Sequence, residues 1–223
     1  MSNTNKPAAK RLLVALTLAV SALTGCTGLE IPLIAAGFAS GTLAASDRRT
    51  LGTQLEDRGI QLKAETRLAQ KFGDASHINA TVFNRRLILT GEVPDEATRK
   101  AAEREAATIE NVRVIVNELE VSGKSSLTSR SNDAIISSKV KASMIDNREI
   151  YTGAYKYVTE RGNVYLLGIA TERESNIAAD TVAGVPGVVR VVKSIDYISE
   201  DERERIMKSQ AASDTNTGSP VRQ

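Results

Sequence analysis

The chain of 223 residues contains one cysteine, Cys26, and one histidine, His77. A thiol can form a disulfide, bind a metal or accept a covalent group, but Cys26 has no second cysteine with which to pair. There is no Cys-x-x-Cys spacing and no second histidine to complete a zinc site. A Ser-His-Asp or Cys-His centre could form only around His77. We expect His77 to be a solvated side chain beside a turn, and the chain to be neither an enzyme nor the carrier of a metal or cofactor.

The residues before Cys26 have the pattern of an export signal. Three cations, Lys6, Lys10 and Arg11, precede about a dozen apolar or small residues, a run too short to cross a bilayer as a helix. Leu23-Thr24-Gly25-Cys26 resembles a bacterial lipobox, in which the cysteine sulfur receives diacylglycerol before the leader is cleaved. The resemblance implies a lipoprotein signal peptide over residues 1–25 and lipid attachment at Cys26. The alternative is an ordinary signal peptide followed by an incidental cysteine.

Lipidation would decide where the mature chain resides. Two or more acyl chains anchor a protein stably in a membrane, whereas one acyl chain does so only marginally. The residue after the cysteine is Thr27 and not Asp, which by resemblance to bacterial lipoprotein sorting implies the outer membrane. We therefore expect a protein that is lipid-anchored in the outer membrane and faces the periplasm, with residues 26–54 as a tether.

Composition restricts the classes of partner. Apolar residues make up 41% and charged residues 25% of the chain, as in soluble folded domains. The leader contains three cations and no acid, so its removal changes the formal net charge from +2 to −1. The chain has no tryptophan and only 4% aromatic residues. The mature chain therefore has neither a positive net charge nor many aromatic side chains on which bases could stack, so we do not expect nucleic acid as a partner. We also expect the protein to be a monomer.

Residues 55–122 are predicted to fold as helix, strand, strand, helix and strand. Apolar residues recur every fourth position from Ile60 to Phe72, which is typical of an amphipathic helix. Alternating residues from Ile78 and an apolar run over 87–89 predict two strands around a turn at Asn84-Arg85. An alanine-rich helix and the strand from Val112 follow.

The same order of elements returns in residues 132–199, after a polar linker at 123–131. Asp133 is a candidate cap for its first helix, and Thr171 and Glu174 have the spacing of a capping box for its second. The two copies are offset by 76 or 77 residues, so we infer a tandem duplication of one small α+β domain. Residues 200–223 are charged and then polar, and we expect a fraying helix followed by a disordered tail.

Both copies resemble the BON domain. The family pattern is a helix, a strand that ends in V-x-L-x-G, an alanine-rich helix and a last strand that opens with G-V-x-x-V. The second copy has Val164, Leu166, Gly168, Gly187, Val188 and Val191 at these positions, and the first has Leu87, Leu89, Gly91, Val112 and Ile115. Asn111 stands where the glycine of G-V is expected in the first copy. With the lipobox, the chain resembles dual-BON outer-membrane lipoproteins.

The first helix of the second copy carries two apolar stripes. Residues Ile136, Val140 and Met144 are expected to face the sheet, and Ile135, Ala142 and Ile145 the opposite side, with Lys139 between them. A helix that packs on a sheet needs only one such stripe. The second stripe could enter an anionic lipid headgroup layer or dock on an envelope protein. It could also pack on the first domain or the linker, or consist of ordinary isolated surface residues, and the residues alone slightly favour these structural explanations.

The family resemblance favours the interpretation that this second stripe contacts lipid. It implies that the second BON domain binds anionic phospholipid, in particular phosphatidylglycerol, and supports envelope integrity. The contact residues that we expect are Ile135, Ser138, Lys139, Ala142 and Ile145. The alternative function is a periplasmic interaction module that docks on an envelope protein through the same helix.

Overall fold

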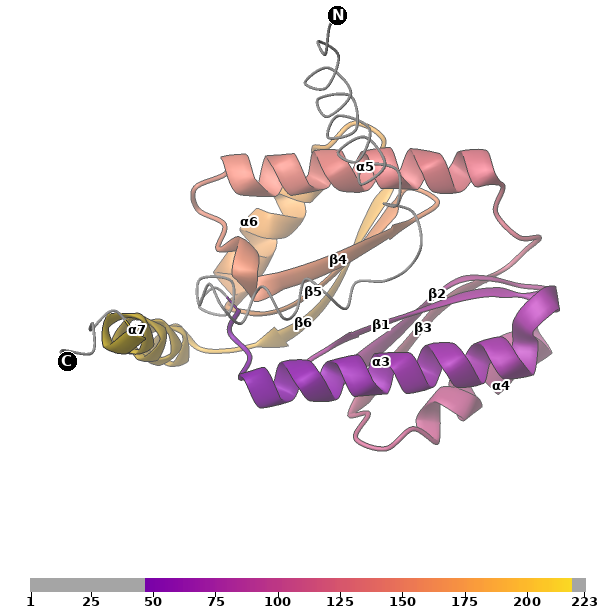
Figure 1. Cartoon of the computed structure of the whole chain (residues 1–223). Coiled ribbons are helices and arrows are strands. Elements are labelled where there is room, and N and C mark those ends of the chain that lie inside the picture. Colours follow the sequence, from indigo (N-terminus) through magenta and orange to yellow (C-terminus); the bar gives the residue numbers. More distant parts are fainter. Residues whose placement is uncertain (1–46, 218–223) are drawn as a thin grey trace, which may run out of the picture. The chain divides into compact units, whose positions relative to one another are not determined.

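A computed structural model describes residues 47–217 of the chain (Figure 1). The expected leader, Cys26 and most of the expected tether lie outside the described residues. The helices and strands are α3 (Leu51–Phe72), β1 (His77–Phe83), β2 (Arg86–Val93), α4 (Glu96–Ala107), β3 (Val114–Val121), α5 (Leu127–Asp146), β4 (Tyr155–Glu160), β5 (Asn163–Ala170), α6 (Glu172–Ala183), β6 (Arg190–Tyr197) and α7 (Glu200–Thr217). Short 3-10 helices precede β1 and β4.

Each copy forms a three-stranded sheet with one antiparallel and one parallel pair of strands. β1 runs antiparallel to β2, which runs parallel to β3, and β4, β5 and β6 repeat this arrangement. A parallel pair needs a crossover connection, and α4 and α6 supply it. The predicted α+β class and the order helix, strand, strand, helix, strand are confirmed in both copies.

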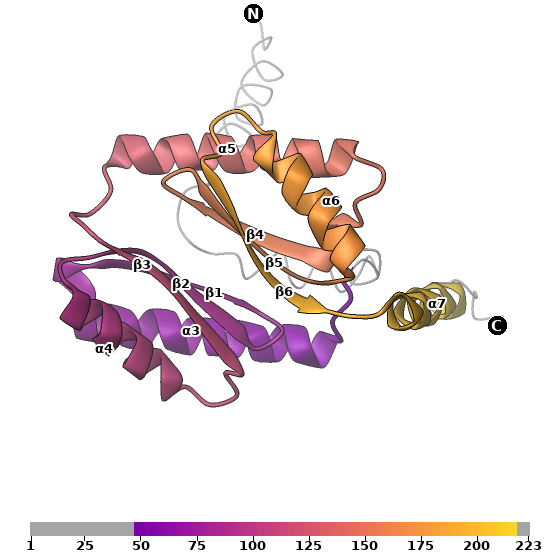
Figure 2. The same ribbon diagram turned by 180° about the vertical axis from the view of Figure 1, so that it is seen from behind.

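Each sheet carries its own pair of helices on one face, as the two opposite views show (Figures 1 and 2). The stripe from Ile60 to Leu68 on α3 packs with the apolar side of β1 and β2. The equivalent stripe of Ile136, Val140 and Met144 on α5 packs with β5 and α6. The helix periodicity therefore predicted the buried faces correctly.

The opposite faces of the two sheets meet in a shared apolar cluster. Its buried members are Phe83 and Ile88 from the first sheet and Tyr165 and Leu167 from the second. Asp196 on β6 adds a polar contact, since it accepts hydrogen bonds from Arg86 at 2.8 Å and Asn84 at 2.7 Å. The two copies are therefore in direct contact through buried apolar side chains and paired charges.

Both hairpin turns are held by an aspartate from the preceding helix. Asp57 on α3 accepts the backbone N–H groups of Asn84 and Arg85 at 2.6 and 2.7 Å, and both turn residues have positive φ. Asp133 on α5 accepts those of Arg161 and Gly162 at 2.9 and 2.8 Å. Asp133 therefore lies within the helix and orders the turn, and the prediction that it caps the helix is wrong.

Three boundaries differ from the sequence prediction, two of them because side-chain caps start the helices earlier. α3 starts at Leu51, within the expected tether, because Thr50 Oγ1 accepts the N–H of Thr53 at 3.1 Å. α5 starts at Leu127, within the expected linker, because Ser126 caps it in the same way. α7 reaches Thr217, whereas this segment was expected to fray into a disordered tail. The capping box at the start of α6 is present as predicted.

The family glycines are required by the backbone. Gly187 has φ +103°, and a Cβ there would lie 2.9 Å from the Ile136 side chain. Asn111, which replaces the corresponding glycine in the first copy, also has a positive φ of 68°. Asparagine tolerates this conformation better than most residues, which explains how the first copy keeps the fold without that glycine.

Candidate functional site

The five residues expected to contact lipid all lie on α5 and are all exposed. Ile135 and Ile145 are 55% and 59% exposed, which is high for isoleucine in a folded domain. The face also includes Ser138, Lys139 and Ala142, and it is opposite to the stripe that packs on the sheet. The structure therefore brings these residues together on one face, and that face does not pack on the described part of the first domain.

Two lysines border this apolar face. The Lys139 ammonium lies 3.5 Å from the carbonyl oxygen of Pro186, and neither Lys139 nor Lys141 forms an ion pair with a described residue. Asp146 and Glu149 follow near the end of the helix, and Glu149 pairs with Arg173 at 3.1 Å. The centre of the face is thus apolar with cations beside it, while its acids lie at the C-terminal end.

A shallow hollow of about 240 Å³ opens beside the same face. Lys141, Met144, Ile145 and Tyr157 line it, together with Thr152 and Gly153. Burial raises the pKa of Tyr157, whose hydroxyl remains neutral and lies 3.5 Å from the Ser137 carbonyl oxygen. The hollow combines an apolar floor with a cation at its rim.

The segment that leads into α3 is bound to the second domain. The buried Arg48 guanidinium donates two hydrogen bonds to the Glu174 carboxylate, at 2.8 and 2.7 Å, and one to the Ile169 carbonyl at 2.8 Å. Arg203 on α7 donates to the same carboxylate at 2.7 Å, and Gln210 donates to the Asp47 carbonyl at 2.8 Å. The tether therefore joins the folded part beside α6 and α7.

The Glu174 carboxylate is the centre of this contact. Burial raises its pKa, but hydrogen bonds from Arg48, from the backbone of Thr171 and from Arg203 outweigh burial and lower the pKa to about 2. The same residue completes the capping box of α6. Sequence reasoning identified the cap but missed the partner, because Arg48 lies 126 positions earlier.

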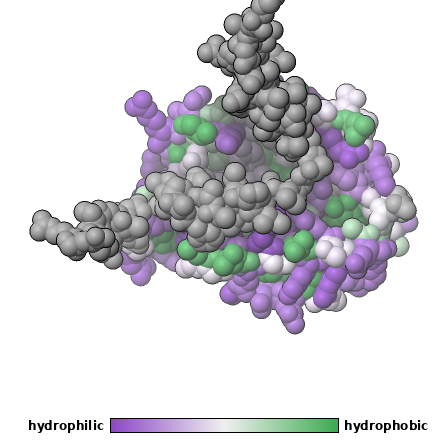
Figure 3. Space-filling view, in the orientation of Figure 1, coloured by the Kyte–Doolittle hydropathy of each residue, from purple (hydrophilic) through white to green (hydrophobic). Residues whose placement is uncertain are grey.

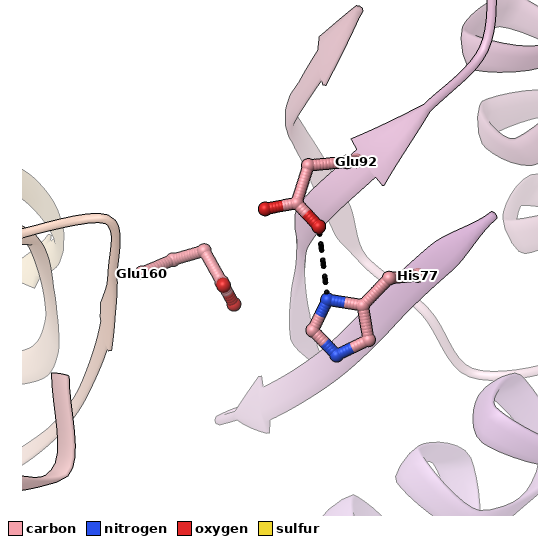
Figure 4. A group of neighbouring side chains, drawn as sticks. All are labelled: His77, Glu92 and Glu160. Carbon is pink, nitrogen blue, oxygen red and sulfur yellow. Dashed lines mark hydrogen bonds and ion pairs between the residues drawn. The ribbon is translucent and has the colours of Figure 1, made fainter. Parts of the chain in front are cut away.

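His77 lies in a cluster that the sequence analysis did not anticipate (Figure 4). Its Nδ1 atom lies 3.1 Å from Glu92 Oε2, the residue directly opposite on β2. Glu160, at the end of β4, points toward the same place and accepts a hydrogen bond from Asn79 at 2.9 Å. A glutamate inside the apolar run of β2 was the signal available in the sequence. His77 is thus half-buried between carboxylates and not a freely solvated side chain.

The surface of the described residues is otherwise mostly hydrophilic on the side seen in Figure 3. Small apolar patches are scattered over that side. On α3, Leu51, Leu55 and Leu62 are exposed. Within residues 47–217, no helix has both the length and the apolar character needed to cross a membrane.

Comparison with known proteins agrees with the duplication. The BON domain model matches residues 57–123 and 132–199. The chain is 32% identical to the outer membrane lipoprotein DolP of Haemophilus influenzae over 178 residues, or 79% of this chain and 90% of that protein. It is 29% identical to the 21 kDa hemolysin of Actinobacillus pleuropneumoniae, over 68% of this chain and 79% of that protein.

Among solved structures, CdsD of the type III secretion system of Chlamydia trachomatis aligns with a TM-score of 0.27 and 10% identity, over 71% of this chain and 98% of that one. That similarity is too low to support an argument. The two matched domains and the identity over most of the chain are sufficient: this protein belongs to the BON-domain family and is a dual-BON protein of the DolP type.

Proposed function

We propose that this protein is an outer-membrane lipoprotein, anchored through Cys26 and facing the periplasm, that binds anionic phospholipid through α5 of its second BON domain. Phosphatidylglycerol is the lipid class that we propose, and support of envelope integrity is the proposed role. The mechanism is non-catalytic. The similarity to an outer membrane lipoprotein over most of the chain supports the location.

The observation that carries the proposal is the exposed face of α5. Ile135 and Ile145 stand out of the surface while lysines lie on the same side, and the core stripe of the helix is fully used by the sheet. An apolar face bordered by cations suits a headgroup layer, because the isoleucines can enter the acyl boundary while the ammonium groups meet phosphates.

The expected affinity of this face alone is modest. Each lysine near an anionic surface contributes about 1 kcal/mol, so Lys139 and Lys141 together contribute about 2 kcal/mol. The lipid anchor makes the second contact intramolecular and raises the effective concentration of headgroups. Weak local recognition is therefore enough once the protein is tethered.

Liposome co-sedimentation tests the proposal with a soluble chain that starts at Asp47, since residues 47–217 contain both domains and the Arg48 contact. Binding should rise with phosphatidylglycerol content and fall with salt. Lys139→Glu should weaken binding by roughly 30-fold, which corresponds to about 2 kcal/mol for a reversed charge. Ile135→Asp should reduce binding to the level of neutral liposomes.

Leu55→Asp is the matched control, because Leu55 is 64% exposed on α3 of the first domain. It should leave liposome binding unchanged. If Leu55→Asp abolishes binding while Ile135→Asp does not, the lipid-binding face has been assigned to the wrong helix. If the wild-type chain binds no liposomes at any phosphatidylglycerol content, the lipid function is wrong and docking of α5 on an envelope protein becomes the better explanation.

A further inference from the structure

We propose that His77, Glu92 and Glu160 form a binding site for a divalent transition-metal ion of the zinc class, with ligands from both BON domains. This site is separate from the α5 face and does not depend on the lipid function. His77 and Glu92 come from β1 and β2 of the first domain, and Glu160 comes from β4 of the second (Figure 4).

The three side chains already converge. One possible ligand atom from each lies within 4.8 Å of the others. Zinc bonds to nitrogen and oxygen are about 2.0–2.2 Å long, so neighbouring ligand atoms in a tetrahedral site are about 3.4 Å apart. His77 Nδ1 and Glu92 Oε2 are 3.1 Å apart. Side-chain movements of up to about 1.4 Å would therefore close the site around an ion.

Glu92 is the strongest indication that an ion belongs here. The residue is only 1% exposed, so its carboxylate has lost its contact with solvent. Oε2 accepts the backbone N–H of Ser125 at 3.0 Å and faces His77. Oε1 forms an ion pair with Arg161 Nε at 3.0 Å, although the geometry is not that of a hydrogen bond. A buried carboxylate is costly unless its charge is balanced, and an ion beside Oε2 would add to the balance that Arg161 supplies at Oε1.

The charges around the cluster can accommodate a divalent cation. Glu92 and Glu160 each bring a carboxylate to the same place as the His77 imidazole, so the ligands themselves supply negative charge. Arg161 is a competing cation, as is Arg130 in the same hollow, but Glu120 and the Gly123 carbonyl also hold the Arg161 guanidinium, at 2.9 and 3.0 Å. Arg161 can therefore keep its pairs with Glu120 and Glu92 Oε1, while the ion would bind Glu92 through Oε2, which faces His77.

A hollow of about 520 Å³ gives access to the cluster. His77 and Glu160 line it together with Asn79, Arg130 and residues of α5 and β4. Three protein ligands with an open side leave room for a water molecule as the fourth ligand, as in zinc sites that are not purely structural. An imidazole with two carboxylates favours zinc over Mg²⁺, which prefers oxygen ligands alone.

Binding would join the two domains, because neither domain contains all three ligands. An ion that binds the folded state stabilises it by mass action. At a free zinc concentration of about 100 times Kd, the melting temperature should rise by about 5–10 °C.

The test uses the full-length untagged protein in detergent, stripped with EDTA and then titrated calorimetrically with Zn²⁺ alone. We expect one Zn²⁺ per chain and the stated rise in melting temperature, with no comparable effect of Mg²⁺. His77→Ala and Glu160→Gln should each weaken zinc binding by more than about 100-fold, since even residues behind metal ligands cost about 10–100-fold when replaced. Glu160→Gln keeps an oxygen acceptor for Asn79, so the fold should be retained.

Glu110→Gln is the matched control, because the Glu110 side chain is 83% exposed and, among the described residues, pairs only with Lys63 at 3.5 Å. It should bind zinc as the wild type does. The proposal is overturned if the wild-type protein takes up no stoichiometric zinc. It is equally overturned if His77→Ala and Glu160→Gln keep the wild-type affinity, because zinc would then be bound elsewhere, for example at an unmodified Cys26.

Discussion

Replacing Arg48 with methionine removes the guanidinium that attaches the N-terminal segment to the second BON domain. The Arg48 side chain is completely buried, makes a bidentate pair with Glu174 and lies 5.3 Å from the centre of the Tyr151 ring. Methionine fills a similar volume but supplies no donor. The substitution leaves the Ile169 carbonyl without this donor and Glu174 with Arg203 as its remaining cation.

The expected loss of stability is about 3 kcal/mol. Removing one partner of a buried ion pair costs about 3–5 kcal/mol, and the lower end applies because Arg203 and the α6 cap still satisfy part of the Glu174 carboxylate. For a folded unit of this size, about 3 kcal/mol corresponds to a fall in melting temperature of about 6–12 °C. Thermal and urea unfolding followed by circular dichroism measure both quantities.

The acid dependence of stability gives a second measurement on the same pair. The pKa of Glu174 lies near 2 in the folded protein, below its usual value of 4.5. A carboxyl group with a lowered pKa contributes stability that is fully present above about pH 4.5 and is lost as the pH falls toward 2. After allowance for solvent screening this contribution is about 2 kcal/mol. Plots of the free energy of unfolding against pH for the wild type and for Arg48→Met should therefore converge between pH 5 and pH 2.

Lys63→Met is the control for this experiment. Lys63 and Glu110 form an exposed pair, with side chains 52% and 83% exposed, and such pairs contribute less than about 1 kcal/mol. The reasoning fails if Arg48→Met unfolds within about 1 kcal/mol of the wild type and keeps the same acid dependence. In that case the N-terminal segment is not held by the pair with Glu174.

Three further substitutions, two of them with a matched control, test other parts of the fold by urea unfolding and hydrogen exchange. Gly91→Ala should destabilise the protein by more than about 3 kcal/mol, because φ is +112° and the new Cβ would lie 2.0 Å from a β1 carbonyl oxygen. Its control is Gly59→Ala, which should stabilise α3 by about 0.5–1 kcal/mol because no atom lies within 4 Å of the new Cβ. Leu167→Ala should cost about 2–4 kcal/mol by opening a cavity between the two sheets, and exposed Val189→Ala less than about 0.5 kcal/mol. Asp133→Ala should lower the free energy of unfolding by about 1–3 kcal/mol. It should also speed hydrogen exchange of the two turn N–H groups that donate to the Asp133 carboxylate. Unchanged exchange would show that the turn forms without Asp133.

The elements of the fold were predictable because their signals are local. The stripe from Ile60 to Leu68 and its counterpart from Ile136 to Met144 repeat at helical spacing, and the structure buries both. The exposed side of α5 followed from the same periodicity, since residues that do not face the sheet must face the other way. The helix starts at Leu51 and Leu127 were missed, because the caps at Thr50 and Ser126 precede the first buried residue by several positions.

By itself, the sequence determined the duplication, the α+β modules, the family and the apolar face of α5, because periodicity and repeated motifs depend only on neighbouring residues. Only the tertiary structure decided that His77 meets Glu160 and that Arg48 meets Glu174, since these partners lie far apart in the chain. The two sheets pack face to face, and that packing brings β1, β2 and β4 together at one partly buried place. Buried polar groups then require partners within a few ångströms, and no local pattern records which distant side chain the fold will bring there.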